Sequence, residues 1–124
     1  MNREDIARII AKLPELNEFG IGLLEGGKGM SATEKKAALR RGREALRDSA
    51  DVCTAVCGWL ANKSKTKQIN KSINSHGLKH IAAEEIGRPV SNGALIVAAI
   101  FSGFDYKLMR NNPNVHFNIS GASL

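Results

Sequence analysis

Two pairs of potential metal ligands occur in the sequence, Cys53-x-x-x-Cys57 and His76-x-x-x-His80. Residues four apart on a helix project to one side, so the four side chains could bind a tetrahedral zinc ion. The 18 residues between the pairs exceed the roughly 12 of a zinc finger. Alternatively, both thiols are buried in the apolar segment VCTAVCGWL, as free cysteines commonly are. We favour burial and predict no metal and no cofactor.

The same residue types could serve nucleophilic catalysis, in which a cysteine thiolate needs a histidine base beside it. Cys57 could pair with His80 or His116, but only the residue types support this. The adjacent Glu84 and Glu85 project about 100° apart on a helix and form no obvious acid/base pair. The glycine-rich stretch FGIGLLEGGKGMSA lacks the Gly-Lys-Ser/Thr ending of a P-loop. The sequence therefore predicts that the protein is not an enzyme.

The stretch NNPNVHFN (111–118) gathers several asparagines around His116. Asparagine favours turns, so we predict a turn here. The alternative is a polar recognition loop held by a short strand.

Positive charge is concentrated in the middle of the chain. The net charge is +6, yet residues 1–34 sum to −2 and residues 81–124 are neutral. Residues 35–80 hold eleven Lys and Arg against three Asp and Glu. Such localisation favours a surface that faces nucleic acid or an acidic protein partner, and the alternative is a solvated basic helix face.

Phosphate contacts are the chemistry that this segment could perform, because several cations share one predicted helical face. The predicted nucleic-acid-binding residues are Lys36, Arg40, Arg43, Arg47, Lys63, Lys65, Lys67, Lys71 and Lys79. No aromatic residue is interleaved among them, so stacking on single-stranded bases has little support. Sequence-tolerant binding of duplex DNA is the expected mode.

Two short helices around a turn are predicted by HGLKHIAAEEIG and GRPVSNGALIVAAIFSGF (76–104). Ala83 and Gly87 fit a helix-turn-helix, although Ser91 falls about two residues late. A recognition helix needs polar side chains for base edges, and residues 94–101 have none. A helix that is apolar all round is buried, so we predict the core helix of the fold.

The other elements follow from capping and breaking residues. We expect a first helix from Asn2 or Asp5, a glycine-rich loop, a capping box at Ser31–Glu34, a long helical segment that could divide at Asp48–Ser49, a basic loop over 62–75, and helices 77–86 and 92–102 capped by Ser75 and Ser91. The alternating stretch 115–120 predicts a strand that pairs with residues 19–24 or with a second copy of the chain.

Length and composition predict one domain of mainly α class. The 124 residues are 43% hydrophobic but only 5% aromatic, which favours a helical bundle with an aliphatic core. We expect a helix-turn-helix-like C-terminal half and one short terminal β-strand or hairpin. The regions are an N-terminal helix and glycine-rich loop (1–30), a long basic helical segment and loop (31–75), and a compact apolar helix pair with a short strand (76–124). Two cysteines and no signal-like or membrane-spanning stretch favour the reducing cytoplasm and no membrane partner.

The segments SINSHGLKHIAAEEIG, VSNGALIVAAIFSGF and NPNVHFNIS resemble a core shared by small, uncharacterised proteins of bacterial plasmids, integrative elements and phages. The resemblance covers about the last 50 residues and implies a mobile-element accessory protein, with no specific activity attached. The leading hypothesis is non-catalytic nucleic-acid binding by segment 35–80. The second is an inhibitor or adaptor, for example an anti-defence protein, that docks its basic surface on an acidic or nucleic-acid-handling partner. A homodimer is compatible with both hypotheses.

Overall fold

Five α-helices dominate the computed structural model, which describes all of residues 1–124. The helices are α1 (Arg3–Lys12), α2 (Ala32–Arg47), α3 (Ala50–Leu60), α4 (Ser75–Ile86) and α5 (Asn92–Phe101). Two antiparallel hairpins join β1 (Leu16–Asn17) to β2 (Gly20–Ile21) and β3 (Tyr106–Leu108) to β4 (Val115–Phe117), and 3-10 turns lie at η1 (Leu24–Gly27) and η2 (Gly121–Ser123). The predicted mainly α fold is confirmed.

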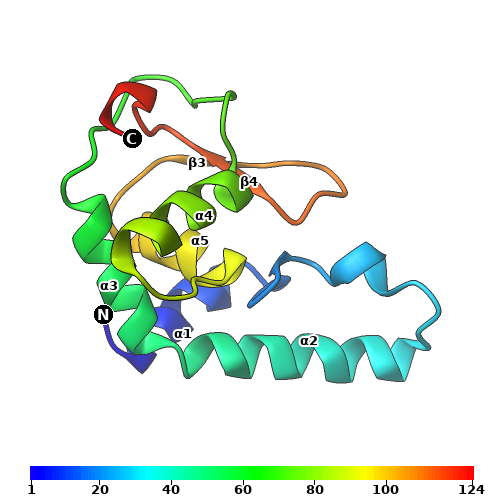
Figure 1. Ribbon diagram of the computed structural model, residues 1–124. Helices are drawn as coiled ribbons and strands as arrows, with labels where there is room; N and C mark the ends of the chain where they lie inside the picture. The colour runs from blue at the N-terminus through cyan, green and yellow to red at the C-terminus, as the bar shows by residue number, and fades with distance from the viewer.

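Helix α5 is the buried centre of the protein (Figure 1). All residues from Asn92 to Ala99 are buried, and α1, α3 and α4 pack around them. The Ser91 hydroxyl starts the helix by accepting a hydrogen bond from the Ala94 amide at 3.0 Å. The prediction of a core helix is confirmed, and this burial is incompatible with a DNA-reading role. Although α5 is strongly apolar, no helix has the length and apolar character needed to cross a membrane.

Helices α2 and α3 divide the long helical segment where the sequence predicts a break. Ser31 and Glu34 form the expected capping box, in which each side chain binds the backbone amide of the other residue. The break falls at residues 48–49, but Ser49 makes no capping hydrogen bond. Its hydroxyl instead donates to the Leu46 carbonyl at 2.6 Å, which closes the end of α2.

The start of α4 differs from the prediction. Asn74, rather than Ser75, is the N-cap, and its Oδ1 accepts hydrogen bonds from the amides of His76 and Gly77 at 3.0 and 3.2 Å. Ser75 is the first helical residue and is fully buried. Its hydroxyl accepts from the Val115 amide at 3.0 Å, so it ties α4 to β4 rather than capping the helix.

The strand predicted in residues 115–120 forms as β4, but its predicted pairing with residues 19–24 is wrong. It pairs with the neighbouring β3, with Tyr106 opposite Phe117. Strand β2 pairs with the adjacent β1. Both pairings close short loops, which costs less chain entropy than a long-range pairing. Every side chain of β3 is exposed, so no alternating apolar pattern marks this strand in the sequence.

The buried Asn17 joins the β1–β2 turn to the helices. Its Nδ2 donates to three carbonyls of that turn at 2.8–3.2 Å. Gly42 of α2 and Gly93 of α5 pack so closely on Asn17 that a Cβ at either position would overlap it. Gly42 therefore lets α2 pack against the Asn17 side chain, and Gly93 lets α5 pack against the Asn17 backbone.

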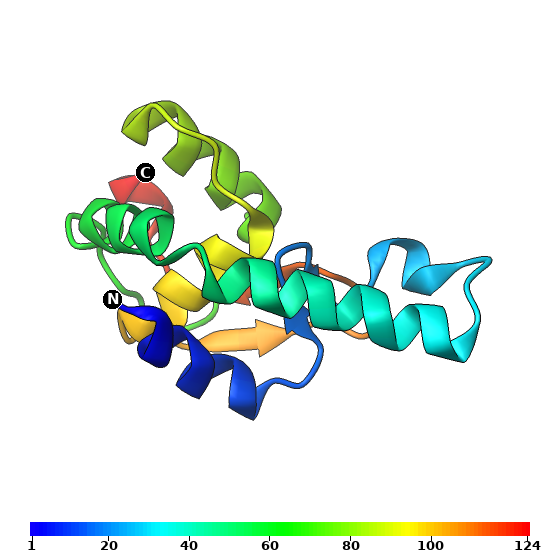
Figure 2. The same ribbon diagram turned by 90° about the horizontal axis from the view of Figure 1, so that it is seen from below.

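The N-terminal half of α2 extends away from the helical body, together with the glycine-rich loop that precedes it (Figures 1 and 2). Residues 32–36 are all exposed, whereas Gly42 and Leu46 further along the helix are buried. We call residues 22–41 the arm.

Candidate functional site

The cations of the arm are exposed and take part in no ion pair or side-chain hydrogen bond within the protein. Lys36 and Arg40 lie one turn apart, about 6 Å along the helix axis. Lys28, Lys35 and Arg41 belong to the same arm and are equally exposed. Because the capping box fixes the start of α2, the four of these cations that lie on α2 are carried by an ordered helix.

Arg43 shares the helical face of Lys36 and Arg40, but its guanidinium is committed to the fold. Its Nη1 donates to the carbonyls of Leu13, Pro14 and Leu16, which follow α1, at 2.8–3.0 Å. Its Nη2 donates to the carbonyl of Ile10 within α1 at 2.8 Å. Partial burial, together with the nearby charge of Arg47, lowers the pKa of Arg43. This side chain adds a charged donor to carbonyls at the end of α1 and in the turn that leads to β1.

Arg47 is occupied by an ion-pair network. Its Nη1 lies 3.0 Å from Glu44 Oε2, and Arg3 of α1 pairs with both Glu44 and Asp48. The hydrogen bond from Arg3 is the main cause that lowers the pKa of Glu44. Glu44 and Asp48 at this end of α2 are therefore both paired with Arg3, and Glu44 also pairs with Arg47.

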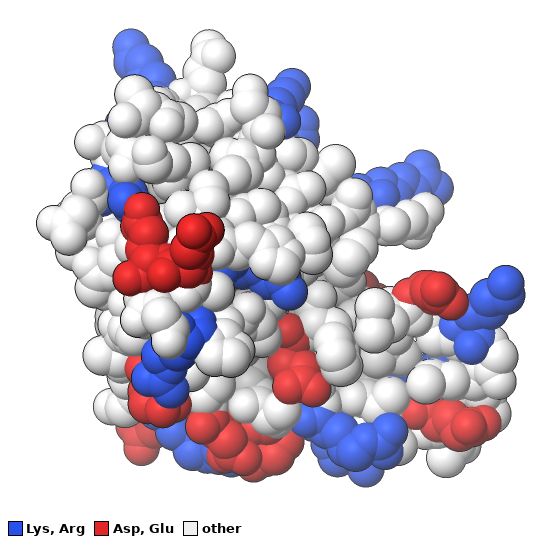
Figure 3. Space-filling view, viewed as in Figure 1, with Lys and Arg blue, Asp and Glu red and all other residues white.

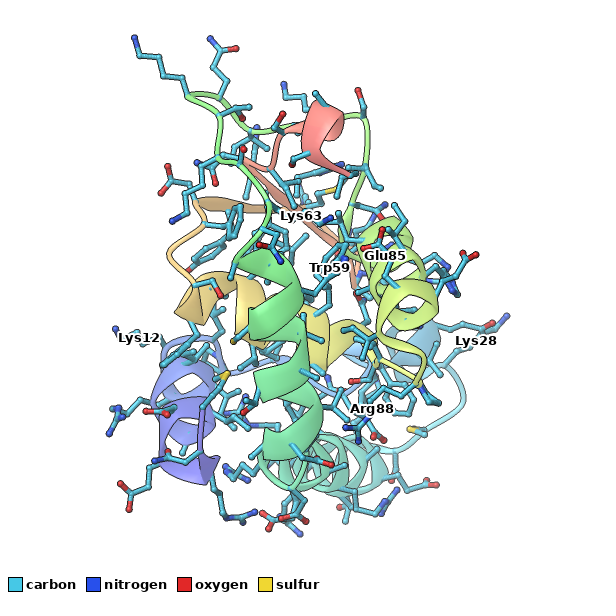
Figure 4. The ribbon with its side chains drawn as sticks, turned by 60° about the vertical axis from the view of Figure 1, so that its left-hand side comes forward. Lys12, Lys28, Trp59, Lys63, Glu85 and Arg88 are labelled. Carbon is cyan, nitrogen blue, oxygen red and sulfur yellow. The ribbon has the colours of Figure 1, made fainter.

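Lys63 belongs to the contact between α3 and α4, where Figure 4 shows it beside Trp59 and Glu85. Its ammonium lies 3.6 Å from Glu85 Oε2 and 4.9 Å from the centre of the Trp59 ring. The Trp59 indole N–H donates to the same carboxylate. Only 10% of the Lys63 side chain is exposed, so little of it remains for a ligand. At the opposite end of α3, Arg88 Nη2 donates to Asp51 at 2.9 Å.

Lys65, Lys67 and Lys71 lie in the loop of residues 61–74, which we call the basic loop. Figures 1 and 4 place this loop at the opposite end of the molecule from α2. The Lys65 ammonium stands 5.2 Å from the centre of the Phe104 ring. The basic segment therefore forms two separate surfaces, the arm and the basic loop, rather than one.

A groove of about 890 Å³ separates the arm from the β3–β4 hairpin. Figure 3 shows the molecule hollowed between these two elements. Apolar side chains in the groove come from Ile21, Leu23, Leu39, Leu108 and Met109. Lys35 and Lys36 line it from the arm, Arg110 lines it from the hairpin, and Glu15 and Glu25 are its acidic members. The groove thus combines an apolar lining with cations on two facing elements.

The two Cys–His pairs do not form one metal site. The thiols of Cys53 and Cys57 donate to carbonyls of α5 at 4.0 and 3.9 Å, while His76 and His80 are exposed on α4. Nowhere do three or more His, Cys, Asp or Glu side chains gather as metal ligands. The four-ligand interpretation is therefore wrong. Burial raises the pKa of the Cys53 thiol, as expected for an unreactive core cysteine.

Cys57 binds α5 rather than a histidine, and it makes no hydrogen bond to His80 or His116. The structure therefore holds no thiolate–imidazole pair of the kind that cysteine nucleophiles require. The thiols of α3 face the buried helix α5, whereas His80 on α4 faces solvent, so Cys57 and His80 lie on different sides of their helices.

The asparagine-rich stretch 111–118 is built into the fold. Asn114 Oδ1 accepts from Asn92 Nδ2 at 3.0 Å, and Asn118 Nδ2 donates to the Thr66 carbonyl at 2.9 Å. These contacts connect the β3–β4 hairpin to α5 and to the basic loop. The turn prediction is confirmed. Asn114 and Asn118 serve the packing of the fold, while Asn111 and Asn112 line the groove beside the arm.

Lys79 stands apart from both basic surfaces. It lies on α4 beside a smaller pocket of about 500 Å³, whose polar lining includes His76, Ser91 and Asn92. The sequence pattern did not single out Arg110, which faces the arm only because the hairpin folds back across the groove. Tertiary structure alone brings it there.

No known protein family, curated protein or solved structure matches this chain. The candidate site therefore rests on its own geometry.

Proposed function

We propose that the protein binds nucleic acid without catalysing a reaction, through phosphate contacts of the arm. The observation that carries the proposal is the excess of exposed, unpaired cations on the arm, which holds five Lys and Arg against Glu25 and Glu34. Lys36 and Arg40 are exposed and unpaired, with three further cations on the same arm. All three acids of residues 35–80 are held by arginines, because Arg3 pairs with Glu44 and Asp48, and Arg88 pairs with Asp51.

The arm suits the polyanionic backbone of a duplex for physical reasons. A capped helix presents its charges without having to order them on binding, so less conformational entropy is lost than for a flexible tail. Each Lys or Arg that neutralises a phosphate releases a condensed counterion, which makes affinity strongly dependent on salt. The arm contains no Asn or Gln, the side chains that read adenine edges, and we expect sequence-tolerant binding.

Fluorescence anisotropy with a mixed-sequence DNA duplex at rising salt tests this proposal. About four phosphate contacts predict that affinity falls roughly 150-fold between about 50 and 200 mM salt. No binding at the lowest salt, or binding that salt leaves unchanged, would overturn the proposal.

The lining of the groove favours a second candidate, in which the protein is an inhibitor or adaptor that docks on an acidic protein. Phosphates do not require apolar contacts, but the groove places Leu108 and Met109 opposite Lys35 and Lys36. Protein interfaces combine an apolar centre with a charged rim in this way.

Capture experiments from a nuclease-treated bacterial lysate separate the two candidates. Leu108 is 41% exposed, so Leu108→Asp should leave the fold intact. A partner that the wild type captures and Leu108→Asp loses, with DNA affinity unchanged, supports docking through the groove. A partner that both proteins capture equally, or the absence of any partner, counts against it.

The mobile-element origin, the cytoplasmic location and the homodimer stay predictions of the sequence.

A further inference from the structure

His76 and His80 converge one turn apart on the exposed face of α4. Their Nε2 atoms lie 3.2 Å apart, and the ring centres are separated by 4.6 Å with an interplanar angle of 85°. In metal-free protein this approach corresponds to one N–H···N hydrogen bond between neutral rings of complementary tautomers. The two Nε2 atoms are therefore already adjacent on the exposed side of the helix.

That separation matches the bite of two histidines on one metal ion. Zinc–nitrogen bonds of about 2.0–2.1 Å at a tetrahedral angle place the two nitrogens about 3.3 Å apart. We propose that His76 and His80 form a two-histidine site for an imidazole-preferring divalent transition-metal ion such as Zn²⁺, with water in the remaining positions. The two cysteines of the four-ligand interpretation take no part in this site.

The helix that carries the pair is anchored near both ligands. The N-cap Asn74 accepts from the His76 amide, and the buried Ser75 binds β4 through the Val115 amide. The first turn of α4 therefore holds its backbone in place before any ion arrives. Neither imidazole is needed for these contacts, so replacing one should leave the helix folded.

The surroundings of His76 set the strength of the site. Lys79 lies on α4 between the two histidines in the sequence and lines the same pocket as His76. The charge of Lys79 opposes a cation, so we expect a weaker site than a four-ligand structural one. The pocket of about 500 Å³ beside His76 leaves room for waters and is also lined by the Glu18 side chain.

This inference is independent of the proposed function, because no cation of the arm takes part in it. Calorimetric titration of the full-length, untagged protein with zinc chloride in a non-chelating buffer at neutral pH tests it. We expect one ion per chain, and a loss of affinity of at least about tenfold in His76→Ala and in His80→Ala. The matched control is His116→Ala, which removes the third histidine of the chain and should bind zinc as the wild type does.

Three outcomes would overturn the site: no binding by the wild type, unchanged affinity in either α4 variant, or an equal loss in the His116 control. Circular dichroism of each variant confirms that α4 remains folded. A parallel titration with nickel chloride should rank the variants in the same order, since both ions take imidazole ligands.

Discussion

The two halves of α2 use their basic side chains differently. Lys36 and Arg40 in the arm half are exposed and unpaired, whereas Arg43 and Arg47 in the other half bind carbonyls of the chain and Glu44. All four are spaced for one helical face. The difference arises because only the second half of the helix overlies α1, whose end presents carbonyls that need a donor.

This contrast shows that a row of cations on one helical face can combine a structural and a binding role. Where α2 leaves the body of the protein, Lys36 and Arg40 form no ion pair or hydrogen bond through their side chains and are exposed to solvent. The predictions below separate the two halves, beginning with the largest expected effect.

Among the four cations Lys36, Arg40, Arg43 and Arg47, the substitution Arg43→Ala should destabilise the fold most. It removes four hydrogen bonds from the guanidinium to carbonyls at and beyond the end of α1, and a hydrogen bond to a charged group contributes about 1.5–3 kcal/mol. We expect a loss of about 2–3 kcal/mol in the free energy of unfolding, measured by urea denaturation. Arg41→Ala, which removes an exposed charge from the same helix, is the control and should change stability by less than about 0.5 kcal/mol. Equal losses in both variants would contradict the structural role of Arg43.

The double substitution Lys36→Ala with Arg40→Ala should have the opposite profile. Each phosphate contact contributes close to tenfold in affinity at about 0.1 M salt, so the loss should be roughly 50-fold. The slope of log affinity against log salt should fall by about two. Stability should stay within about 0.5 kcal/mol of the wild type, since neither side chain has a partner in the fold. DNA affinity that survives this change would place the contact elsewhere.

Lys63→Ala tests a cation whose ammonium group already contacts other side chains of the protein. Its contacts with Glu85 and the Trp59 ring should be worth about 0.5–1 kcal/mol, because the carboxylate is half exposed. DNA affinity should not change. A loss of affinity comparable to that of the arm variants would show that Lys63 leaves Glu85 to bind phosphate.

Glu44→Gln gives the smallest effect, and the effect depends on pH. The hydrogen bond from Arg3 holds the pKa of Glu44 below its ordinary value. Its contribution to stability is therefore present above the unfolded pKa of about 4.3 and is lost as the pH falls through the lower folded pKa. The melting temperature of the variant should lie below that of the wild type at neutral pH. The difference between the two melting temperatures should shrink toward about pH 3. A gap that widens in acid would contradict this sign.

Local signals predicted most of the helical framework. The capping box at Ser31, the N-cap Ser91 and the end of α4 at Ile86 all lie where the sequence placed them. The cap of α4 was misassigned because Asn74 and Ser75 are adjacent residues with similar propensity. Only the distant Val115 amide, which Ser75 binds, distinguishes their roles.

The site was less predictable, because it depends on which cations meet a partner from another element. Residue spacing places Arg43 on the same helical face as Lys36. No feature of the neighbouring sequence shows that the end of α1 packs against Arg43. The exposed strand β3 likewise carries no apolar alternation, so the hairpin that brings Arg110 to the groove could not be anticipated. Long-range contacts decide both cases.

The central claim is that the arm, rather than the basic loop, binds the polyanion. Its most direct test compares two triple variants of equal charge on one DNA duplex at one salt concentration. The arm variant carries Lys36→Ala, Arg40→Ala and Arg41→Ala, and the loop variant carries Lys65→Ala, Lys67→Ala and Lys71→Ala. We predict that the arm variant loses roughly 100-fold or more in affinity at about 0.1 M salt, while the loop variant stays within about threefold of the wild type. An equal or larger loss in the loop variant would contradict the account.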